Sequence, residues 1–117
     1  MLLVDDHRHV RRVLREYLCL CQEVIVVGEA AGGAEAVQLT GELLPDVVLM
    51  DITMPGMSGV EATTLIRRSY PEVRVITISS YPEPEVRDGA LEAGAADHLL
   101  KPVTLRELQD ALDRSRK

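Results

Sequence analysis

The stretch PDVVLMDITMPGMSG, residues 45–59, places an acidic residue directly at the end of a buried-strand pattern. Apolar residues run without a break from Val47 to Met50, and Asp51 follows at once. A continuous apolar run of this kind is typical of a parallel strand whose two faces are both buried. A proline and two glycines then favour a tight turn. The stretch therefore predicts a strand over 46–50 that ends at a carboxylate.

Similar apolar runs alternate with segments of helical spacing along the rest of the chain. The pattern predicts strands over 1–4, 24–27, 46–50, 73–79 and 96–100, and helices over 6–21, 32–44, 58–70, 82–94 and 104–117. Two helices begin with a capping box, Ser58 with Glu61 and Thr104 with Glu107. Strands that alternate with helices form parallel sheets covered on both faces. Five such units predict an α/β fold, a doubly wound, flavodoxin-like five-stranded parallel sheet in the order 2-1-3-4-5.

The composition suits a single domain over residues 1–117, with no linker, repeat or second domain. A net charge of −6 and only 3% aromatic residues argue against direct nucleic-acid binding, which favours basic surfaces and stacking side chains. No apolar run approaches the roughly 20 residues that cross a bilayer, and no signal peptide is recognisable. We therefore expect a cytoplasmic domain without a membrane partner. Cys19 and Cys21 alone are a weak metal pattern and are interpreted as reduced thiols.

Three acids follow two strands that are neighbours in the predicted sheet. In this fold, ligands bind beyond the carboxyl ends of the strands where strand order reverses, here between the first and third strands. Asp5 and Asp6 follow the first strand and Asp51 follows the third. Two carboxylates about 5 Å apart repel by roughly 3 kcal/mol at an effective dielectric constant near 20. A hard divalent cation offsets this repulsion, so the acids predict a Mg²⁺ site; the alternative is that single acids cap helices, as Asp6 does if it begins the first helix.

Two more polar residues follow strands at the same predicted edge. Ser79, beside Ser80, ends the fourth strand, and Lys101 follows the fifth. A carboxylate nucleophile, a metal ion, a hydroxyl and an ammonium together suit the transfer of a phosphoryl group. Taken singly, the serine fits an ordinary strand end and the lysine an ordinary surface position. Their joint placement is what favours phosphoryl chemistry.

Four motifs together resemble the receiver domain of two-component response regulators over essentially the whole chain. They are LLVDDH at 2–7, PDVVLMDITMPGMSG at 45–59, VRVITISS at 73–80 and GAADHLLKP at 94–102. The VDDH opening and the GMSGVEATTLIRR helix look most like the NarL/FixJ-type branch, whose members usually carry a C-terminal helix-turn-helix output domain. The resemblance implies that this DNA-binding domain lies outside the present sequence. A stand-alone receiver is the alternative.

The resemblance also implies a role for each acid. Asp51 matches the phospho-acceptor, which takes a phosphoryl group from a histidine kinase. Asp6 matches the direct Mg²⁺ ligand, and Asp5 matches the neighbouring acid that orients the ion through water. Thr53 matches the residue whose backbone carbonyl binds the metal.

Further residues match the parts of the family that respond to phosphorylation. Ser79 matches the switch hydroxyl, and Lys101 matches the lysine that pairs with the phosphoryl group. His98 stands where the family often has a Tyr or Phe that swings inward on activation, and a histidine there can titrate near neutral pH. A solvent-exposed strand residue is the alternative for His98. His7 and His9 are expected to be exposed and not to bind the metal, because Mg²⁺ prefers oxygen ligands.

These features together predict a phosphorylation switch, a signalling module and not a classical enzyme, although it catalyses its own phosphorylation and slow hydrolysis. Phosphorylation of Asp51 is expected to bias a surface formed by the fourth helix, fifth strand and fifth helix, and so to alter homodimerisation or output-domain contact. A phosphate-independent interaction module is the alternative, disfavoured because such receivers typically lose an acid or the lysine. A haloacid-dehalogenase-like phosphatase is disfavoured because Thr53 stands where that family has an acid.

Overall fold

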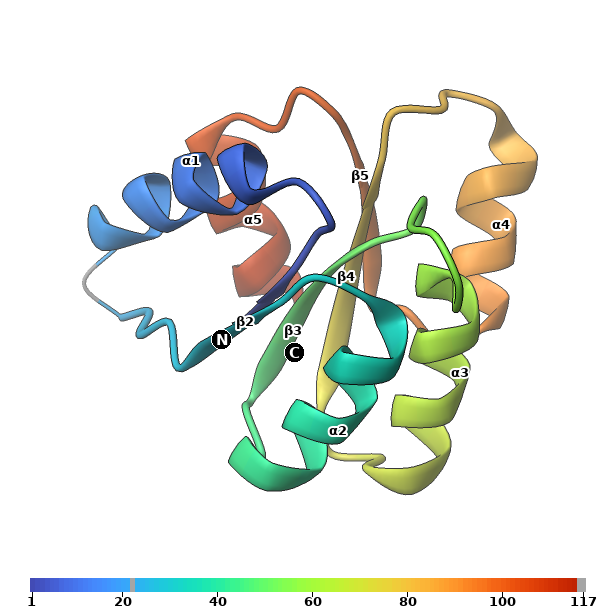
Figure 1. Cartoon of the computed structure of the whole chain (residues 1–117). Coiled ribbons are helices and arrows are strands. Elements are labelled where there is room, and N and C mark those ends of the chain that lie inside the picture. Colours follow the sequence, from blue (N-terminus) through green and yellow to red (C-terminus); the bar gives the residue numbers. More distant parts are fainter. Residues whose placement is uncertain (22, 116–117) are drawn as a thin grey trace.

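The structure, a computed structural model, describes residues 1–21 and 23–115 (Figure 1). Its elements are β1 (Leu2–Val4), α1 (Arg8–Cys19), β2 (Gly28–Ala30), α2 (Gly33–Leu43), β3 (Val47–Asp51), α3 (Gly59–Ser69), β4 (Arg74–Ser79), α4 (Pro84–Glu92), β5 (Asp97–Leu100) and α5 (Leu105–Ser115). The strands form one parallel sheet in the order β2-β1-β3-β4-β5. The predicted fold class and strand order are therefore confirmed. The last two residues of the final predicted helix lie outside the described part of the chain.

The helices form two layers around the sheet. Helices α1 and α5 cover one face, and α2, α3 and α4 cover the other (Figure 1). Because side chains alternate along a strand, Leu49 of β3 packs toward α1 and α5, whereas Val48 and Met50 pack toward α2 and α3. The buried central strand thus supports both layers and carries Asp51 at its carboxyl end.

The second strand differs from its prediction. The sequence places it over residues 24–27, but β2 covers Gly28–Ala30. The register pairs Leu2 with Gly28, so only Val27 comes opposite Met1, whose carbonyl accepts its N–H at 2.9 Å. Residues 24–26 lie past the end of this ladder, and Ile25 is 75% exposed. The Met1 ammonium still donates to the carbonyl of Ile25 at 2.7 Å, so the β-branched run lies beside the start of β1 while the regular ladder begins at Gly28.

The predicted capping box at Thr104 is complete, and the one at Ser58 shows the bond to the serine side chain. The Ser58 side chain accepts the N–H of Glu61 at 3.2 Å at the start of α3. Before α5, the Thr104 hydroxyl accepts the N–H of Glu107 at 3.1 Å, and the Glu107 carboxylate accepts the N–H of Thr104 at 3.3 Å. These bonds satisfy backbone donors that a helix N-terminus leaves unpaired. They fix the starting points of helices that leave the functional edge of the sheet.

Candidate functional site

The three predicted acids meet at the carboxyl edge of the sheet. Strands β1 and β3 are paired with Val4 opposite Met50, so Asp5 and Asp51 emerge side by side. Asp5 is fully buried and Asp51 is 2% exposed. Asp5, Asp6, Asp51 and His7 each offer a ligand atom, and these atoms lie within 4.8 Å of one another. The proximity predicted from strand order is therefore confirmed.

The environment of Asp51 opposes its negative charge. Burial, followed by the negative charge of Asp5, raises the pKa of Asp51 from 3.8 to about 6. The Lys101 ammonium and the backbone N–H of Thr53 lower that pKa and so offset part of the effect. A divalent cation in the cluster would favour the ionised carboxylate strongly.

The donor set fits a hard divalent cation. All three acids offer carboxylate oxygens, the ligands that Mg²⁺ prefers. Asp6 Oδ1 is buried and accepts no hydrogen bond within the described part of the chain, although His7 Nδ1 lies 3.1 Å away. That nitrogen lies equally close to Asp5 Oδ1, so a single imidazole serves two acidic oxygens. Three carboxylates gathered around so little positive charge indicate a place for a cation.

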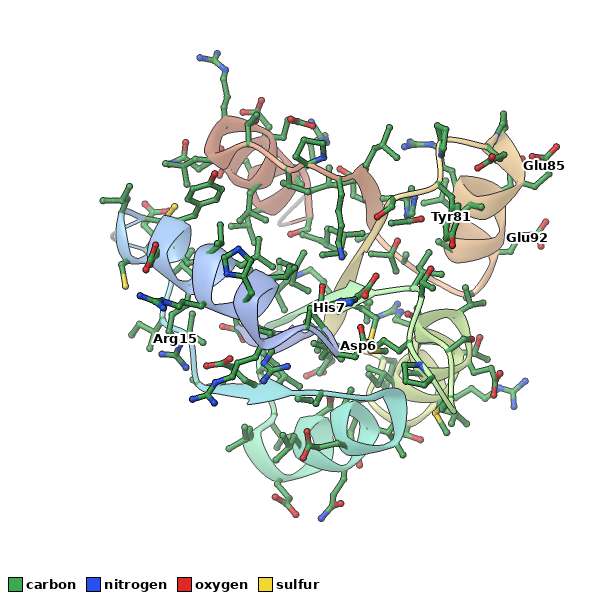
Figure 2. The ribbon with its side chains drawn as sticks, turned by 45° about the horizontal axis from the view of Figure 1, so that its top comes forward. Asp6, His7, Arg15, Tyr81, Glu85 and Glu92 are labelled. Carbon is green, nitrogen blue, oxygen red and sulfur yellow. The ribbon has the colours of Figure 1, made fainter. Side chains whose placement is uncertain are left out.

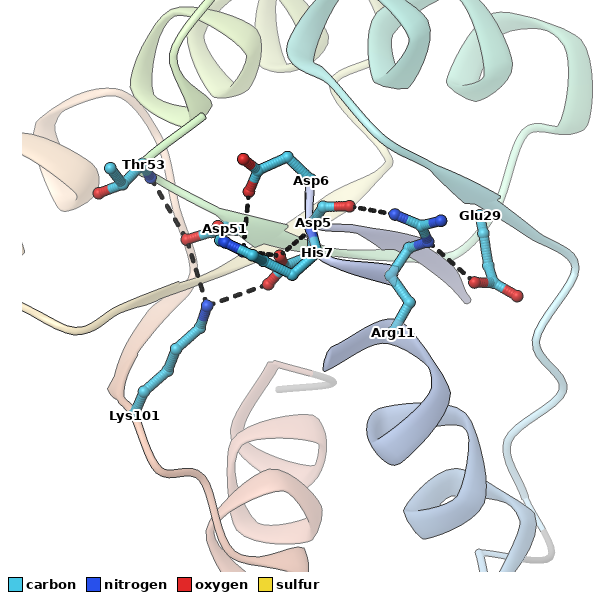
Figure 3. A network of polar contacts seen from close by, with 8 residues as sticks. All are labelled: Asp5, Asp6, His7, Arg11, Glu29, Asp51, Thr53 and Lys101. Carbon is cyan, nitrogen blue, oxygen red and sulfur yellow. Dashed lines mark hydrogen bonds and ion pairs between the residues drawn. The ribbon is translucent and has the colours of Figure 1, made fainter. Parts of the chain in front are cut away.

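Lys101 connects the acids across the sheet. Its Nζ donates to Asp5 Oδ2 at 3.0 Å and lies 3.7 Å from Asp51 Oδ1 (Figure 3). Its backbone N–H donates to the carbonyl of Ser79 at 2.8 Å, which ties the segment after β5 to the end of β4. The prediction that Lys101 joins the same edge is confirmed. Its ammonium is placed between the two buried carboxylates.

The chain after Asp51 turns closely around the site. The N–H of Thr53 donates to Asp51 Oδ1 at 3.3 Å. Gly59, the first residue of α3, approaches the main chain so closely that an added Cβ would lie 2.2 Å from the carbonyl oxygen of Asp51. Only glycine permits this approach. Gly59 therefore brings α3 against the end of β3 and keeps the turn compact.

Ser79 lies at the same edge, and none of the hydrogen bonds seen among the described residues joins its hydroxyl to the acids. It is fully buried at the end of β4, one residue past Ile78, the partner of Asp51 in the ladder. Its Oγ accepts the N–H of Tyr81 at 2.9 Å. The hydroxyl thus contacts the loop that leads into α4. This contact links the candidate site to that helix.

His98 is buried, so the reading as a solvent-exposed residue is wrong. It is 8% exposed, and its Nδ1 lies 2.8 Å from Thr77 Oγ1 on the neighbouring strand. Its Nε2 is buried and has no hydrogen-bond partner within the described residues. Burial, then the positive charge of Arg87, lowers the pKa of His98 against the opposing influence of Asp97. The ring is therefore more firmly neutral than an ordinary histidine at neutral pH.

Two side-chain contacts with the acid pair were not predicted from the sequence. His7 is exposed as predicted, yet its Nδ1 lies 3.1 Å from both Asp5 Oδ1 and Asp6 Oδ1. Arg11 donates from Nη1 to the backbone carbonyl of Asp5 at 2.6 Å. The position of His7 directly after the acid pair was an available signal. Arg11 carried no such signal, because its contact depends on how α1 crosses the end of β1.

The parallel sheet and the buried acids at its switch point define a flavodoxin-like receiver architecture. A family model described as the response regulator receiver domain matches residues 1–113. The chain therefore belongs to the response regulator receiver domain family.

Individual relatives agree with this assignment. Response regulator protein VraR of Staphylococcus aureus is 40% identical over 112 residues, which cover 96% of this chain and 54% of the relative. The signal receiver domain of the response regulator NarL from Mycobacterium tuberculosis superposes with a TM-score of 0.90 and 41% identity, covering 98% of this chain and 94% of that chain. The CheX–CheY–BeF3–Mg complex from Borrelia burgdorferi gives a TM-score of 0.88 and 28% identity, covering 95% of this chain and 84% of that chain. The NarL match agrees with the predicted NarL/FixJ-type branch.

The chain spans about half the length of the curated relatives it matches. Among the described residues, no helix has the length and apolar character required to cross a membrane.

Proposed function

We propose that this receiver domain is a phosphorylation switch in which a histidine kinase transfers a phosphoryl group to Asp51. The observation that carries the proposal is the setting of the Asp51 carboxylate. It is buried beside Asp5 and Asp6, with Lys101 Nζ 3.7 Å from its Oδ1. Like charges held this close cost free energy in the metal-free fold. The same arrangement becomes favourable when a metal ion and a phosphoryl group bind.

The transfer itself requires a nucleophile and neutralisation of charge. A carboxylate oxygen of Asp51 attacks the phosphorus of a phosphohistidine, so a P–O bond forms while the P–N bond breaks. The electron pair of the broken bond returns to the imidazole nitrogen of the kinase. Asp5, Asp6, Asp51 and the backbone carbonyl of Thr53 are the groups that would hold Mg²⁺. When bound, this ion supplies neutralisation of the charge on the phosphoryl oxygens.

Lys101 and Ser79 are the proposed ligands of the transferred group. Lys101 already lies between Asp5 and Asp51, and its ammonium can bond a phosphoryl oxygen on Asp51. The Ser79 hydroxyl can donate to another such oxygen if it gives up its contact with the N–H of Tyr81. That exchange would move the loop between β4 and α4. Ser79 is therefore the residue proposed to couple phosphorylation of Asp51 to movement of α4.

The surface formed by α4, β5 and α5 is the proposed output of the switch. Figure 2 shows the site residues Asp6 and His7 between α1, which carries Arg15, and α4, which carries Glu85 and Glu92. Ala90 is the buried residue of α4. A helix with so little buried apolar area is inexpensive to shift. In this proposal His98, which lies beneath that surface, serves as the switch ring.

The partners follow from the same scheme. The phosphoryl donor is a histidine kinase, and the output is a C-terminal DNA-binding domain, for which the greater length of the relatives leaves room. The present domain makes no nucleic-acid contact in this scheme, in keeping with its net charge of −6. Homodimerisation through the altered surface and a cytoplasmic location complete the proposal. Phosphoryl uptake and slow loss are its intrinsic chemistry, but the domain acts as a signalling module.

Phosphorylation can be tested directly with a small donor. The domain is incubated with Mg²⁺ and acetyl phosphate, and its intact mass is measured beside an Asp51→Asn variant. We expect the wild type to gain one phosphoryl group and lose it slowly. The variant, and wild type with the metal chelated, should gain none.

The outcomes separate the competing functions. A stable phosphoryl group on Asp51→Asn would contradict the assignment of the acceptor. A wild-type domain that is folded yet takes neither acetyl phosphate, beryllofluoride nor a phosphoryl group from histidine kinases would favour the phosphate-independent interaction module.

A further inference from the structure

Arg11 of α1 contacts the acidic site through the main chain. Its side chain is 15% exposed, and Nη1 donates to the backbone carbonyl of Asp5 at 2.6 Å (Figure 3). A hydrogen bond from a charged donor at this distance is among the stronger ones in proteins. Arg11 therefore holds the peptide that joins Asp5 to Asp6.

Glu29 of β2 fixes the other side of the same guanidinium. Arg11 Nε donates to Glu29 Oε1 at 3.0 Å, and Arg15 Nε donates to Glu29 Oε2 at 3.0 Å. Desolvation alone would raise the pKa of Glu29, but the hydrogen bonds and charges of the two arginines together lower it. The carboxylate is therefore ionised at neutral pH and balances much of the positive charge beside the acids.

The contact lies where the β1–β2 ladder ends. The N–H of Asp5 donates to the carbonyl of Ala30 at 3.1 Å, the next residue of β2 after Glu29. The Asp5 carbonyl is bonded instead by Arg11, which Glu29 holds. Both polar groups of the Asp5 backbone are thus tied to β2, one directly and one through Arg11. A change in this peptide would move the Asp5 and Asp6 carboxylates together.

We propose that Arg11 and Glu29 form a positioning pair that holds the backbone of the acid pair in the geometry required for Mg²⁺ binding. The inference rests on the proposed function, because it concerns the metal of that site. The pair would act through the Asp5 carbonyl and would not itself bind the metal or the phosphoryl group. Loss of groups that orient metal ligands typically weakens metal affinity by about 10–100-fold.

The test compares Arg11→Gln with Arg12→Gln. Arg12 is the next residue of the same helix, and its ion pair within the described residues is an exposed one with Glu16, at 3.5 Å. Mg²⁺ affinity is measured by titration calorimetry, and the rate of labelling by acetyl phosphate is measured across Mg²⁺ concentrations. We expect Arg11→Gln to weaken Mg²⁺ binding about tenfold. At saturating Mg²⁺ its labelling rate should recover to within about twofold of wild type, because the reacting groups remain. Arg12→Gln should match wild type in both measurements.

Two further variants keep the test decisive if Arg11→Gln folds poorly. Glu29→Gln retains an acceptor for Arg11 but loses its charge, so a smaller loss of affinity is expected. Arg11→Lys keeps the positive charge but has a single ammonium in place of the guanidinium fork. We expect it to leave Mg²⁺ binding weakened, and full recovery would show that charge and not geometry is responsible.

The result separates this inference from the proposed function. A wild-type domain that binds no Mg²⁺ and takes no phosphoryl group contradicts the proposed function itself. A competent wild type with unchanged Mg²⁺ affinity in Arg11→Gln overturns the positioning pair alone. An equal affinity combined with a lower melting temperature would assign Arg11 a purely structural role.

Discussion

Helices α4 and α5 lie against opposite faces of β5 and are anchored to the sheet by different chemistry (Figure 1). Helix α5 buries Leu108, Ala111 and Leu112 in an apolar cluster with residues of four strands. Helix α4 buries Ala90 and covers a part of the sheet where Thr77 and His98 are buried. Burial of apolar side chains fixes α5 strongly. Helix α4 buries the small side chain of Ala90 and donates to the sheet from Arg87 Nη1 to the carbonyl of His98 at 3.3 Å, a bond of modest net value. The difference shows how one strand can carry a firmly packed helix on one side and a more easily displaced helix on the other.

The largest change in stability is expected from truncation of a buried side chain on α5. Leu108 is fully buried, so Leu108→Ala should lower the free energy of unfolding by about 2–5 kcal/mol. Leu91 on α4 is 37% exposed, and Leu91→Ala should cost less than about 1 kcal/mol. Urea denaturation measures both. Similar losses in the two variants would contradict the difference in anchoring.

The next test concerns the free-energy cost of the acids at the carboxyl edge of the sheet. Asp51 has its pKa raised to about 6 in the folded state, against 3.8 ordinarily. The folded state therefore holds this proton more tightly, and the stability it contributes below pH 3.8 is lost as the pH rises through about 6. Above that pH the ionised carboxylate costs up to about 3 kcal/mol.

The variant Asp51→Asn should remove this cost. In the presence of a chelator we expect it to be more stable than wild type at pH 7 and to show little advantage near pH 4. Added Mg²⁺ should then stabilise wild type more than the variant, because a bound ligand stabilises the state that binds it and the variant has lost one charged ligand. A variant less stable than wild type at pH 7 would show that Asp51 makes favourable contacts that outweigh repulsion.

A smaller effect is expected from the polar contact beneath α4. Thr77→Val leaves the buried Nδ1 of His98 without its partner, which should cost about 1–3 kcal/mol. His98→Phe keeps a ring of similar size and removes the titrating group. The two substitutions together determine whether the stability of the region beneath α4 depends on the Thr77 hydroxyl or on the His98 imidazole.

The pH dependence of stability separates these cases further. The pKa of His98 is lowered in the folded state by burial and by Arg87, so this state favours the neutral ring. The corresponding stability is fully present above the ordinary value of 6.5 and is lost as the pH falls through the lowered pKa. Below pH 6.5, wild type should lose stability more steeply than His98→Phe. Equal slopes in urea midpoints would mean that the ring is solvated in solution.

Much of the fold could be predicted from the sequence because short sequence patterns marked individual strands and helix starts. Asp51 could be placed at a strand end from the apolar run before it, and the capping boxes marked two helix starts. The second strand was misplaced because its position depends on register with β1, which composition does not encode. A β-branched run shows only that a segment suits a strand, not that a partner is available.

The acidic site was predictable to a similar degree and for a related reason. Strand order alone brings Asp5 and Asp51 together, so the topology was sufficient. The burial of His98 and the contact of Arg11 with the Asp5 carbonyl could not be predicted from the sequence, since both depend on how helices pack over the sheet. Packing of this kind is set by many side chains at once and leaves no short motif.

The smallest change in stability, with the clearest consequence for the comparison, is expected from Ser79→Ala. Loss of the Oγ acceptor for the Tyr81 N–H should cost about 1 kcal/mol. Ser80, its exposed neighbour, provides the matched control in Ser80→Ala.

The same variants test the coupling of the site to α4. With Mg²⁺ and beryllofluoride, we expect amide hydrogen exchange to change in α4 and the loop before it, and to change little in the buried turns of α5. Ser79→Ala should lose the response in α4 while it still binds beryllofluoride, because the hydroxyl links the bound group to that loop. If Ser80→Ala loses the response instead, or if α5 responds as strongly as α4, the switch does not use the weakly anchored face in the way proposed.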